Sequence, residues 1–177
     1  MSRLVDIVAG RRSWSKVTAD APTHEELLPL VAAAARVADH GALAPWRLIE
    51  LRGEAREKLG RAIAKAEGDD KPSTKPLRAS LLIAIVVSLT PSGKVPAWEQ
   101  EAVASGVAHT LSLLLHDAGW GVLWRTGHYT RSKPVRKMHK LAKNEHLLGW
   151  LYVGGIPADA RPGRRTTVNP EKFLSSL

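Results

Sequence analysis

The run Ser80 to Leu89 constrains the fold more than any other part of the chain, because it consists almost entirely of aliphatic and β-branched residues. A continuous apolar run of this length is typical of a strand that is buried on both faces of its sheet. Such a strand needs a layer of other elements on each side, and the run is far too short to cross a bilayer. We therefore expect a central strand inside a layered globular domain.

Helical and strand patterns occur on both sides of this run. Helical spacing of apolar residues predicts helices, and short alternating or apolar runs predict further strands. The expected helices are 2–10, 23–37, 53–67, 97–118 and 132–141, and the expected strands are 47–51, 80–89, 120–124 and 146–153. Thr23 and Glu26 form a capping box for the second helix. We find no internal repeat and no linker, so the order of elements predicts one α+β domain over residues 1–177.

The composition excludes several kinds of chemistry. The chain has no cysteine, so disulfides, thiolate metal sites and cysteine nucleophiles are absent. It also lacks the nucleophile-elbow, zincin, dinucleotide-binding and Walker motifs. His109 and His116 are seven residues apart in the helix 97–118, and such a pair is more often structural than metal-binding. We expect no metal site, and an enzyme made from this chain would need a bound cofactor.

Positive charge is concentrated toward the C-terminus. The net charge is +9, and residues 125–177 hold 11 lysines and arginines against three acidic residues. A basic region of this kind attracts a nucleic acid, a phosphorylated cofactor or only solvent, and charge alone does not choose among them. The N-terminus has no secretory signal pattern. We expect a cytoplasmic protein with no membrane partner.

The segment 120–124 predicts a short buried strand that stops at Arg125, Thr126 and Gly127. A glycine at a strand end permits close approach of the main chain to another group. This strand end is therefore a candidate binding site, and a simple turn into the next helix is the alternative.

Four segments, taken in order along the chain, resemble the nitroreductase family. They are the sequence GRRS at 10–13, the segment ADHGALAPWR at 38–47, VPAWEQE at 95–101, and the strand from Gly119 that ends in WRTG at 124–127. The resemblance covers essentially the whole chain and is greatest to the minimal bacterial members. It implies flavin mononucleotide (FMN) enzymes with a central mixed or antiparallel sheet flanked by helices, in an intertwined homodimer. The C-terminal extension from about residue 155 would cross the partner subunit, and the long helix would form much of the interface.

The resemblance also assigns residues to the flavin phosphate. Arg11, Arg12 and Ser13 would hold it, which suits a dianion because guanidinium groups form charge-assisted hydrogen bonds with phosphate oxygens. A basic residue of the C-terminal tail would add a second contact, and among the arginines there Arg164 is our choice.

The flavin ring would meet a different set of residues. Arg125, Thr126 and Gly127 would present backbone N–H groups and a positive charge to the ring and its N5 atom. Trp124 would line the ring or fill the core, and these two alternatives stay open. His40, on a segment contributed by the partner subunit, would hydrogen-bond the flavin. This chain departs from the family at Ala44, where many members carry an amide that contacts the flavin.

The implied function is an NAD(P)H oxidoreductase. Hydride would pass from NADH or NADPH to flavin N5 and then to a nitroaromatic, quinone or related acceptor in a ping-pong cycle, with no side chain required as acid or base. One alternative is a nucleic-acid-binding module that uses the basic C-terminal third. Another is a family member that binds flavin without reductase activity.

Overall fold

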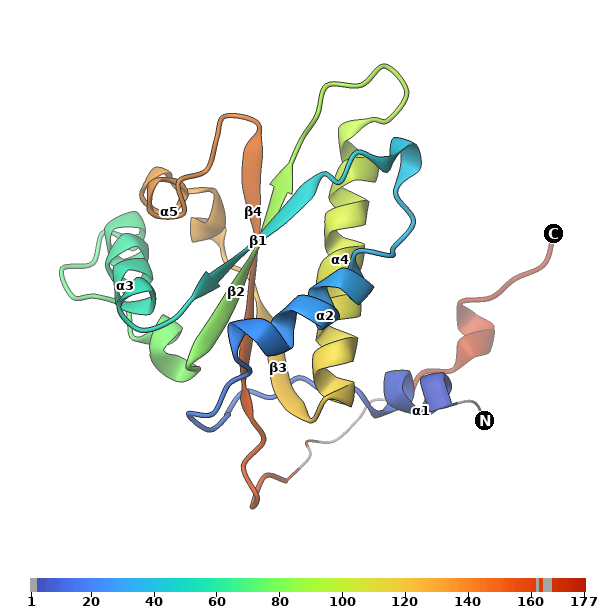
Figure 1. The fold of residues 1–177 in the computed structure, drawn as a ribbon, viewed down its shortest axis with the longest axis horizontal. Helices are drawn as coiled ribbons and strands as arrows, with labels where there is room; N and C mark the ends of the chain where they lie inside the picture. Colours follow the sequence, from blue (N-terminus) through green and yellow to red (C-terminus); the bar gives the residue numbers. More distant parts are fainter. Residues whose placement is uncertain (1–2, 162, 164–166) are drawn as a thin grey trace.

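Four strands form one antiparallel sheet with the order β1–β2–β4–β3 in the computed structural model (Figure 1). The structure describes residues 3–161, 163 and 167–177. The strands are β1 (Trp46–Leu51), β2 (Leu81–Ser88), β3 (Trp120–Arg125) and β4 (Glu145–Gly155). A single parallel bridge joins Ser13 to Val122 at the β3 edge. The expected α+β fold with a sheet flanked by helices is confirmed, and its strands pair antiparallel.

Helices cover both faces of this sheet. One face carries α2 (His24–Ala34) and α4 (Ala97–Asp117), and the other carries α3 (Glu54–Glu67) and α5 (Lys133–Met138) (Figure 1). The helix α1 (Arg3–Gly10) lies at the periphery. Short 3-10 turns complete the described elements: η1 (His40–Ala42), η2 (Lys75–Arg78), η3 (His128–Arg131) and η4 (Pro170–Lys172).

The strand β2 is the central apolar strand that the sequence predicts. Residues 81–87 are all buried, and their side chains alternate between two cores. Leu81, Ile83 and Ile85 pack with α2 and α4, whereas Leu82, Ala84 and Val86 pack with α3 and α5. Continuous apolar strands are characteristic of parallel sheets. Here the same pattern serves an antiparallel strand, because helices exclude water from both faces.

Two helices end earlier than their patterns indicate. The second helix stops at Ala34 instead of residue 37. Ala35 N–H still makes the helical bond to the Val31 carbonyl, but Arg36 N–H bonds the Ala33 carbonyl, three residues back, in a tighter turn. The basic helix spans only Lys133–Met138. Lys140 adopts a left-handed conformation there (φ 52°), and Leu141 N–H bonds the Arg136 carbonyl. This arrangement is a Schellman motif, in which the left-handed residue after the helix is usually a glycine. Because that residue is Lys140 here, the sequence pattern does not predict the helix end.

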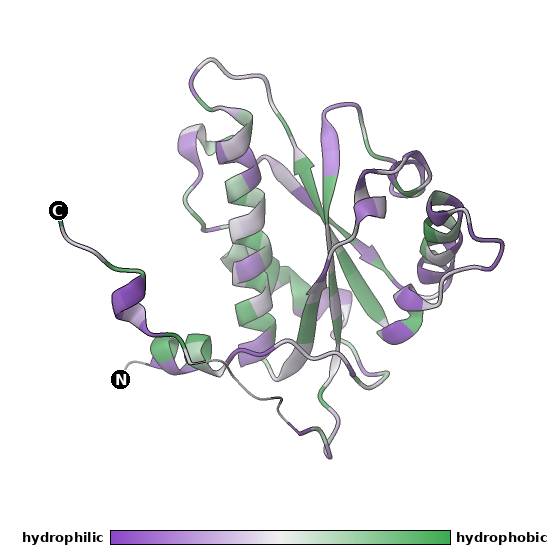
Figure 2. Ribbon diagram, turned by 180° about the vertical axis from the view of Figure 1, so that it is seen from behind, coloured by the Kyte–Doolittle hydropathy of each residue, from purple (hydrophilic) through white to green (hydrophobic). Residues whose placement is uncertain are grey.

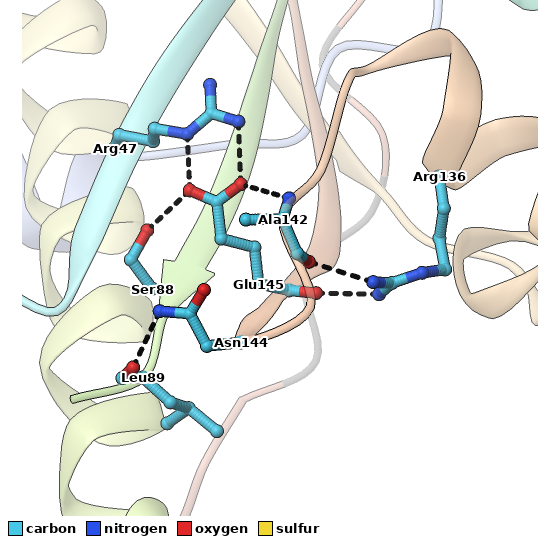
Figure 3. Close-up of polar contacts among 7 residues, drawn as sticks. All are labelled: Arg47, Ser88, Leu89, Arg136, Ala142, Asn144 and Glu145. Atoms are coloured by element: carbon cyan, nitrogen blue, oxygen red, sulfur yellow. Dashed lines mark hydrogen bonds and ion pairs between the residues drawn. The ribbon is translucent and has the colours of Figure 1, made fainter. Parts of the chain in front are cut away.

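A buried carboxylate ties the sheet together at one end (Figure 3). Glu145 is 9% exposed. Arg47 donates to its two oxygens at 2.6 and 2.9 Å, Ser88 Oγ donates at 2.9 Å, and Ala142 N–H donates at 2.9 Å. The Arg47 hydrogen bonds are the main cause that lowers the pKa of Glu145 to about 2, against the opposing effect of burial. The Glu145 carboxylate of β4 thus links side chains of β1 and β2 by hydrogen bonds.

Acid should weaken the fold through this group. The pKa of Glu145 is about 2 in the folded chain and about 4.5 when unfolded. A depressed pKa contributes stability above the unfolded value and loses it as the pH falls toward the folded value. We expect the free energy of unfolding to decrease between about pH 5 and pH 2, as measured by urea denaturation at several pH values. The same measurements on Glu145→Gln should not show this decrease. If the free energy of unfolding fell equally with pH in both proteins, the assignment to Glu145 would be wrong.

Candidate functional site

The segment after α1 runs beside the edge strand β3. Ser13 forms the parallel bridge with Val122, and Trp14 N–H donates to the Val122 carbonyl at 3.0 Å. Further along, Thr18 N–H bonds the Gly155 carbonyl at 2.8 Å. These contacts place Arg11, Arg12 and Ser13 at the outer edge of the sheet.

The end of the same strand carries the second predicted group. Arg125 is the last residue of β3 and pairs with Trp150 of β4, and Thr126 and Gly127 follow it directly. Val122 and Arg125 are three positions apart, which is about 10 Å along a strand. The structure therefore brings the Arg11–Ser13 segment and the Arg125–Gly127 segment to one sheet edge, at a separation that suits an elongated ligand.

Side chains of β3 alternate between the two faces of the sheet. Trp124 points to the α4 side and packs against the core there, which favours the core-filling alternative for its ring. Arg125 points to the other side, where its guanidinium carbon lies 5.4 Å from the centre of the Tyr152 ring. Burial is the main cause that raises the pKa of Tyr152 to about 12, so its phenol stays neutral under Arg125.

Several buried N–H groups at this edge have no acceptor among the described residues. They are Trp14 Nε1, Trp124 Nε1 and Arg125 Nε. A buried donor without a partner is costly, and such groups in folded proteins usually meet a protein atom, a water or a ligand. Trp124 and Arg125 point to opposite faces of the sheet, so one ligand cannot meet all three donors.

Gly149 of β4 lets the main chain close around the strand end. Its φ is 141°, and a Cβ built there would lie 2.4 Å from the Arg125 carbonyl oxygen and 3.1 Å from the Thr126 methyl carbon. Any larger residue would push the Arg125–Thr126 segment away from β4. A Cβ at Gly127 would likewise lie 2.6 Å from the Tyr129 ring. The sequence analysis did not predict Gly149 as a site residue. The one sequence feature that could have indicated it is a glycine inside a strand, which often marks a close approach of two backbones.

His40 lies elsewhere in the chain. Its Nδ1 is 2.9 Å from Glu99 Oε2 in the first turn of α4, whereas Gly10 lies against His116 near the other end of that helix. Between residues 99 and 116 a helix rises about 25 Å, and Figure 1 shows η1 and α1 at opposite ends of α4. Within one chain, His40 is thus remote from Arg11–Ser13.

The loop that carries His40 has an unusual backbone. Gly41, Ala42 and Ala44 have φ values of 77°, 50° and 45°. The left-handed region costs an alanine about 1–2 kcal/mol, and Asp39 Oδ2 holds the loop by accepting a hydrogen bond from Ala44 N–H at 2.8 Å. Backbone strain of this kind often marks binding sites.

Replacing Ala42 with glycine should stabilise the folded chain. Glycine adopts a φ of 50° without a Cβ penalty, and its greater freedom when unfolded offsets part of the gain. We expect Ala42→Gly to raise the free energy of unfolding by about 0.5 kcal/mol in urea denaturation. The matched control Ala33→Gly, inside α2, should lower it by about 1 kcal/mol. If both variants lowered the free energy of unfolding equally, the backbone at Ala42 would not be strained.

The C-terminal tail is predicted to contact the flavin phosphate through Arg164. Arg164 lies outside the described residues, so its role stays a prediction. Arg12 Nη1 donates to the carbonyl of Gly163, which brings the tail to the Arg11–Ser13 segment.

Among the residues with described positions, no three histidine or acidic side chains form a metal-binding group. None of the helices described is long and apolar enough to span a membrane.

Comparison with known proteins identifies the class. The model of the Nitroreductase family matches residues 8–155. "Putative NAD(P)H nitroreductase YdjA" from Escherichia coli K12 is 33% identical over 158 residues, which is 85% of this chain and 86% of that protein. The chain therefore belongs to the nitroreductase family and is an oxidoreductase.

Solved structures share the fold. A nitroreductase-like family protein from Bacillus cereus superposes with a TM-score of 0.87 at 20% identity, and the match covers 100% of this chain and 97% of that one. The FMN and NADPH-dependent nitroreductase NfnB from "sphigopyxis sp. strain HMH" superposes with a TM-score of 0.77 at 16% identity, covering 99% of each chain. At these identities the likeness concerns the fold.

Proposed function

We propose that this protein is an FMN-dependent NAD(P)H oxidoreductase of the cytoplasm, formed by one flavin-binding domain that works as a homodimer. The observation that supports it most is the β3 edge, where Arg11–Ser13 and Arg125–Gly127 lie along one strand. FMN is elongated, with an anionic phosphate at one end and a ring bearing carbonyl and nitrogen acceptors at the other.

The chain's own residues bind and orient the cofactor. Arg11 and Arg12 would supply guanidinium groups to the phosphate, and Ser13 would supply a hydroxyl. The main chain at Thr126 and Gly127 would lie close to the ring, and the charge of Arg125 would favour electron density there. When bound, FMN would supply the chemistry of hydride transfer from NADH or NADPH to a nitroaromatic, quinone or related acceptor in a ping-pong cycle. Solvent supplies protons, so the protein mainly positions the reactants.

Exposed apolar surface supports the homodimer. The helix α1 buries none of its residues, and Leu4 and Val8 point into solvent. Figure 2 shows α1 as a largely hydrophobic helix at the periphery. Phe173 and Leu174 of the C-terminal tail are exposed as well. A second copy would cover these side chains, and the extension from about residue 155 would cross it.

A second copy would also bring His40 to the flavin. In one chain His40 is about 25 Å along α4 from the Arg11–Ser13 end. Only a loop from another chain could then contribute this imidazole to the same cofactor, as the family resemblance implies.

The nucleic-acid alternative has less support. Arg136 of α5 donates to the carbonyls of Glu145 at 2.6 Å and Ala142 at 3.0 Å, so it holds the fold together. The helix that would carry the basic surface spans only Lys133–Met138, which is shorter than the predicted segment.

Anaerobic spectroscopy tests the proposed function. The purified protein should be yellow, or become so with added FMN, and NADH or NADPH should bleach its absorbance. A nitroaromatic or quinone should then restore the colour in stopped-flow experiments. Protein that binds no FMN would contradict the proposal, and a bound flavin that neither NADH nor NADPH bleaches would indicate a flavin carrier.

A further inference from the structure

A buried polar pair lies in the core next to the loop that follows β3. Trp150 of β4 and His139, the C-cap residue of α5, are 1% and 5% exposed. Trp150 Nε1 donates to His139 Nε2 at 3.0 Å, and His139 Nδ1 donates to the Val135 carbonyl at 2.9 Å. Both ring nitrogens of the histidine are therefore used inside the protein, in a core that is otherwise largely apolar.

These partners allow only one form of the imidazole. An indole N–H can only donate, so His139 Nε2 must accept and carries no hydrogen. A carbonyl oxygen can only accept, so the single ring hydrogen is on Nδ1. Burial is the main cause that lowers the pKa of His139, which favours the same neutral form. The Trp150 ring thus has a fixed orientation, because turning it would leave a buried donor and a buried acceptor unpaired.

Trp150 connects this pair to the Arg125–Gly127 segment in two ways. Its main chain is the ladder partner of Arg125 at the end of β3. Its ring is 5.9 Å from the Tyr129 ring, centre to centre, with 32° between the planes. The Tyr129 ring lies directly against Gly127, since a Cβ built on that glycine would be 2.6 Å from it. A change in the Trp150 ring would therefore move the support of Gly127.

Gly127 is also held through its carbonyl group. The N–H and the Oγ1 of Thr130 both donate to this carbonyl, at 3.0 and 2.9 Å, and Thr130 is 7% exposed. The Gly127 N–H has no acceptor in the part of the chain that the structure describes. With the carbonyl and the Cα fixed, this N–H has one direction, and a hydrogen bond to a ligand weakens steeply when its donor turns away.

We propose that His139 is a positioning residue for the main-chain donor at Gly127: it fixes the Trp150 ring, and Trp150 holds Tyr129 against the glycine. His139 is too deeply buried to touch a ligand, so it acts through these two rings. Binding sites depend on side chains behind them that packing and hydrogen bonds hold in one rotamer. That the Gly127 N–H donates to a flavin rests on the proposed function, whereas the order that His139 gives to the loop does not.

Hydrogen exchange on the FMN-free chain, followed by NMR, tests this order without the cofactor. His139→Leu removes the acceptor of the Trp150 N–H. We expect the Thr130 amide, which bonds the Gly127 carbonyl, to exchange about tenfold faster in this variant, the change that one lost hydrogen bond produces. His139→Gln should exchange like the unaltered protein, because its amide oxygen is as many bonds from the Cα as Nε2 and accepts from the indole.

A matched control lies in the same core. Leu51 is 1% exposed on β1, which β2 separates from β4. Leu51→Ala lowers the overall stability but should leave exchange at Thr130 unchanged, because this amide exchanges through local opening. Trp150→Phe breaks the same hydrogen bond from the other side and keeps a ring, so it should act like His139→Leu and decides the question if that variant does not fold. Unchanged exchange in the folded variants, or an equal increase in Leu51→Ala, would overturn the proposal.

FMN titrations keep this proposal apart from the proposed function. His139→Leu should weaken FMN binding by about tenfold, as expected for one poorly directed hydrogen bond. His139→Gln and Leu51→Ala should bind FMN as the unaltered protein does. An unchanged FMN affinity in His139→Leu would overturn the role of His139 alone. If exchange responded as expected in protein that binds no FMN, the role of His139 would be supported and the proposed function contradicted.

Discussion

Replacing both Arg11 and Arg12 with alanine should weaken FMN binding by about 100-fold. In the proposed site each guanidinium would form charge-assisted hydrogen bonds with the phosphate, and such bonds contribute about 1.5–3 kcal/mol each. The expected loss is the sum of two contributions near the lower end of this range. Fluorescence titration with FMN measures it, since the free and bound flavin differ in emission. The fold should persist, because these residues follow α1 at the edge of the molecule.

The control for this variant removes the same charge elsewhere. Arg36 and Arg61 are exposed and lie outside the β3 edge. Salt screens the attraction between such distant charges and the phosphate, so replacing both with alanine should change FMN affinity by less than about threefold. A similar loss in both double variants would show that net charge, rather than the Arg11–Arg12 pair, attracts the cofactor.

Replacing Glu145 with alanine should lower the free energy of unfolding by about 3 kcal/mol. The change leaves Arg47, the Ser88 hydroxyl and Ala142 N–H without their common acceptor. Breaking a buried ion pair from one side typically costs about 3–5 kcal/mol. We take the lower end, because the Arg47 side chain is 40% exposed and can reach water. Urea denaturation at neutral pH measures the change.

A surface ion pair provides the comparison. Glu57 and Arg61 lie one helical turn apart on α3 at 3.9 Å, and both are exposed. Glu57→Ala should therefore change stability by less than about 0.5 kcal/mol. A loss of under about 1 kcal/mol in Glu145→Ala would contradict the structural role of the buried carboxylate.

Local sequence signals predicted most of the secondary structure. The apolar run at β2 became the central strand because two helical layers bury both of its faces. Thr23 and Glu26 do form the capping box that their spacing predicts. The stop after α5 could not be predicted, because Lys140 takes a left-handed conformation that sequence patterns assign to glycine.

The site was predicted less completely than the fold. Motifs predict the Arg11–Ser13 and Arg125–Gly127 segments as site residues, and the bridge from Ser13 to Val122 explains why they share one edge. Gly149 was missed, because its importance depends on how closely β4 approaches Arg125. The His40–Glu99 pair was missed for a similar reason, since the two residues are far apart in sequence and only the fold brings them together.

A crystal structure of the protein grown with FMN tests the central claim most directly. We predict two copies of the chain, with the phosphate on Arg11, Arg12 and Ser13, the ring at Arg125–Gly127, and His40 of the partner subunit against the same flavin. A flavin held by one chain alone, or bound away from the β3 edge, would contradict this assignment.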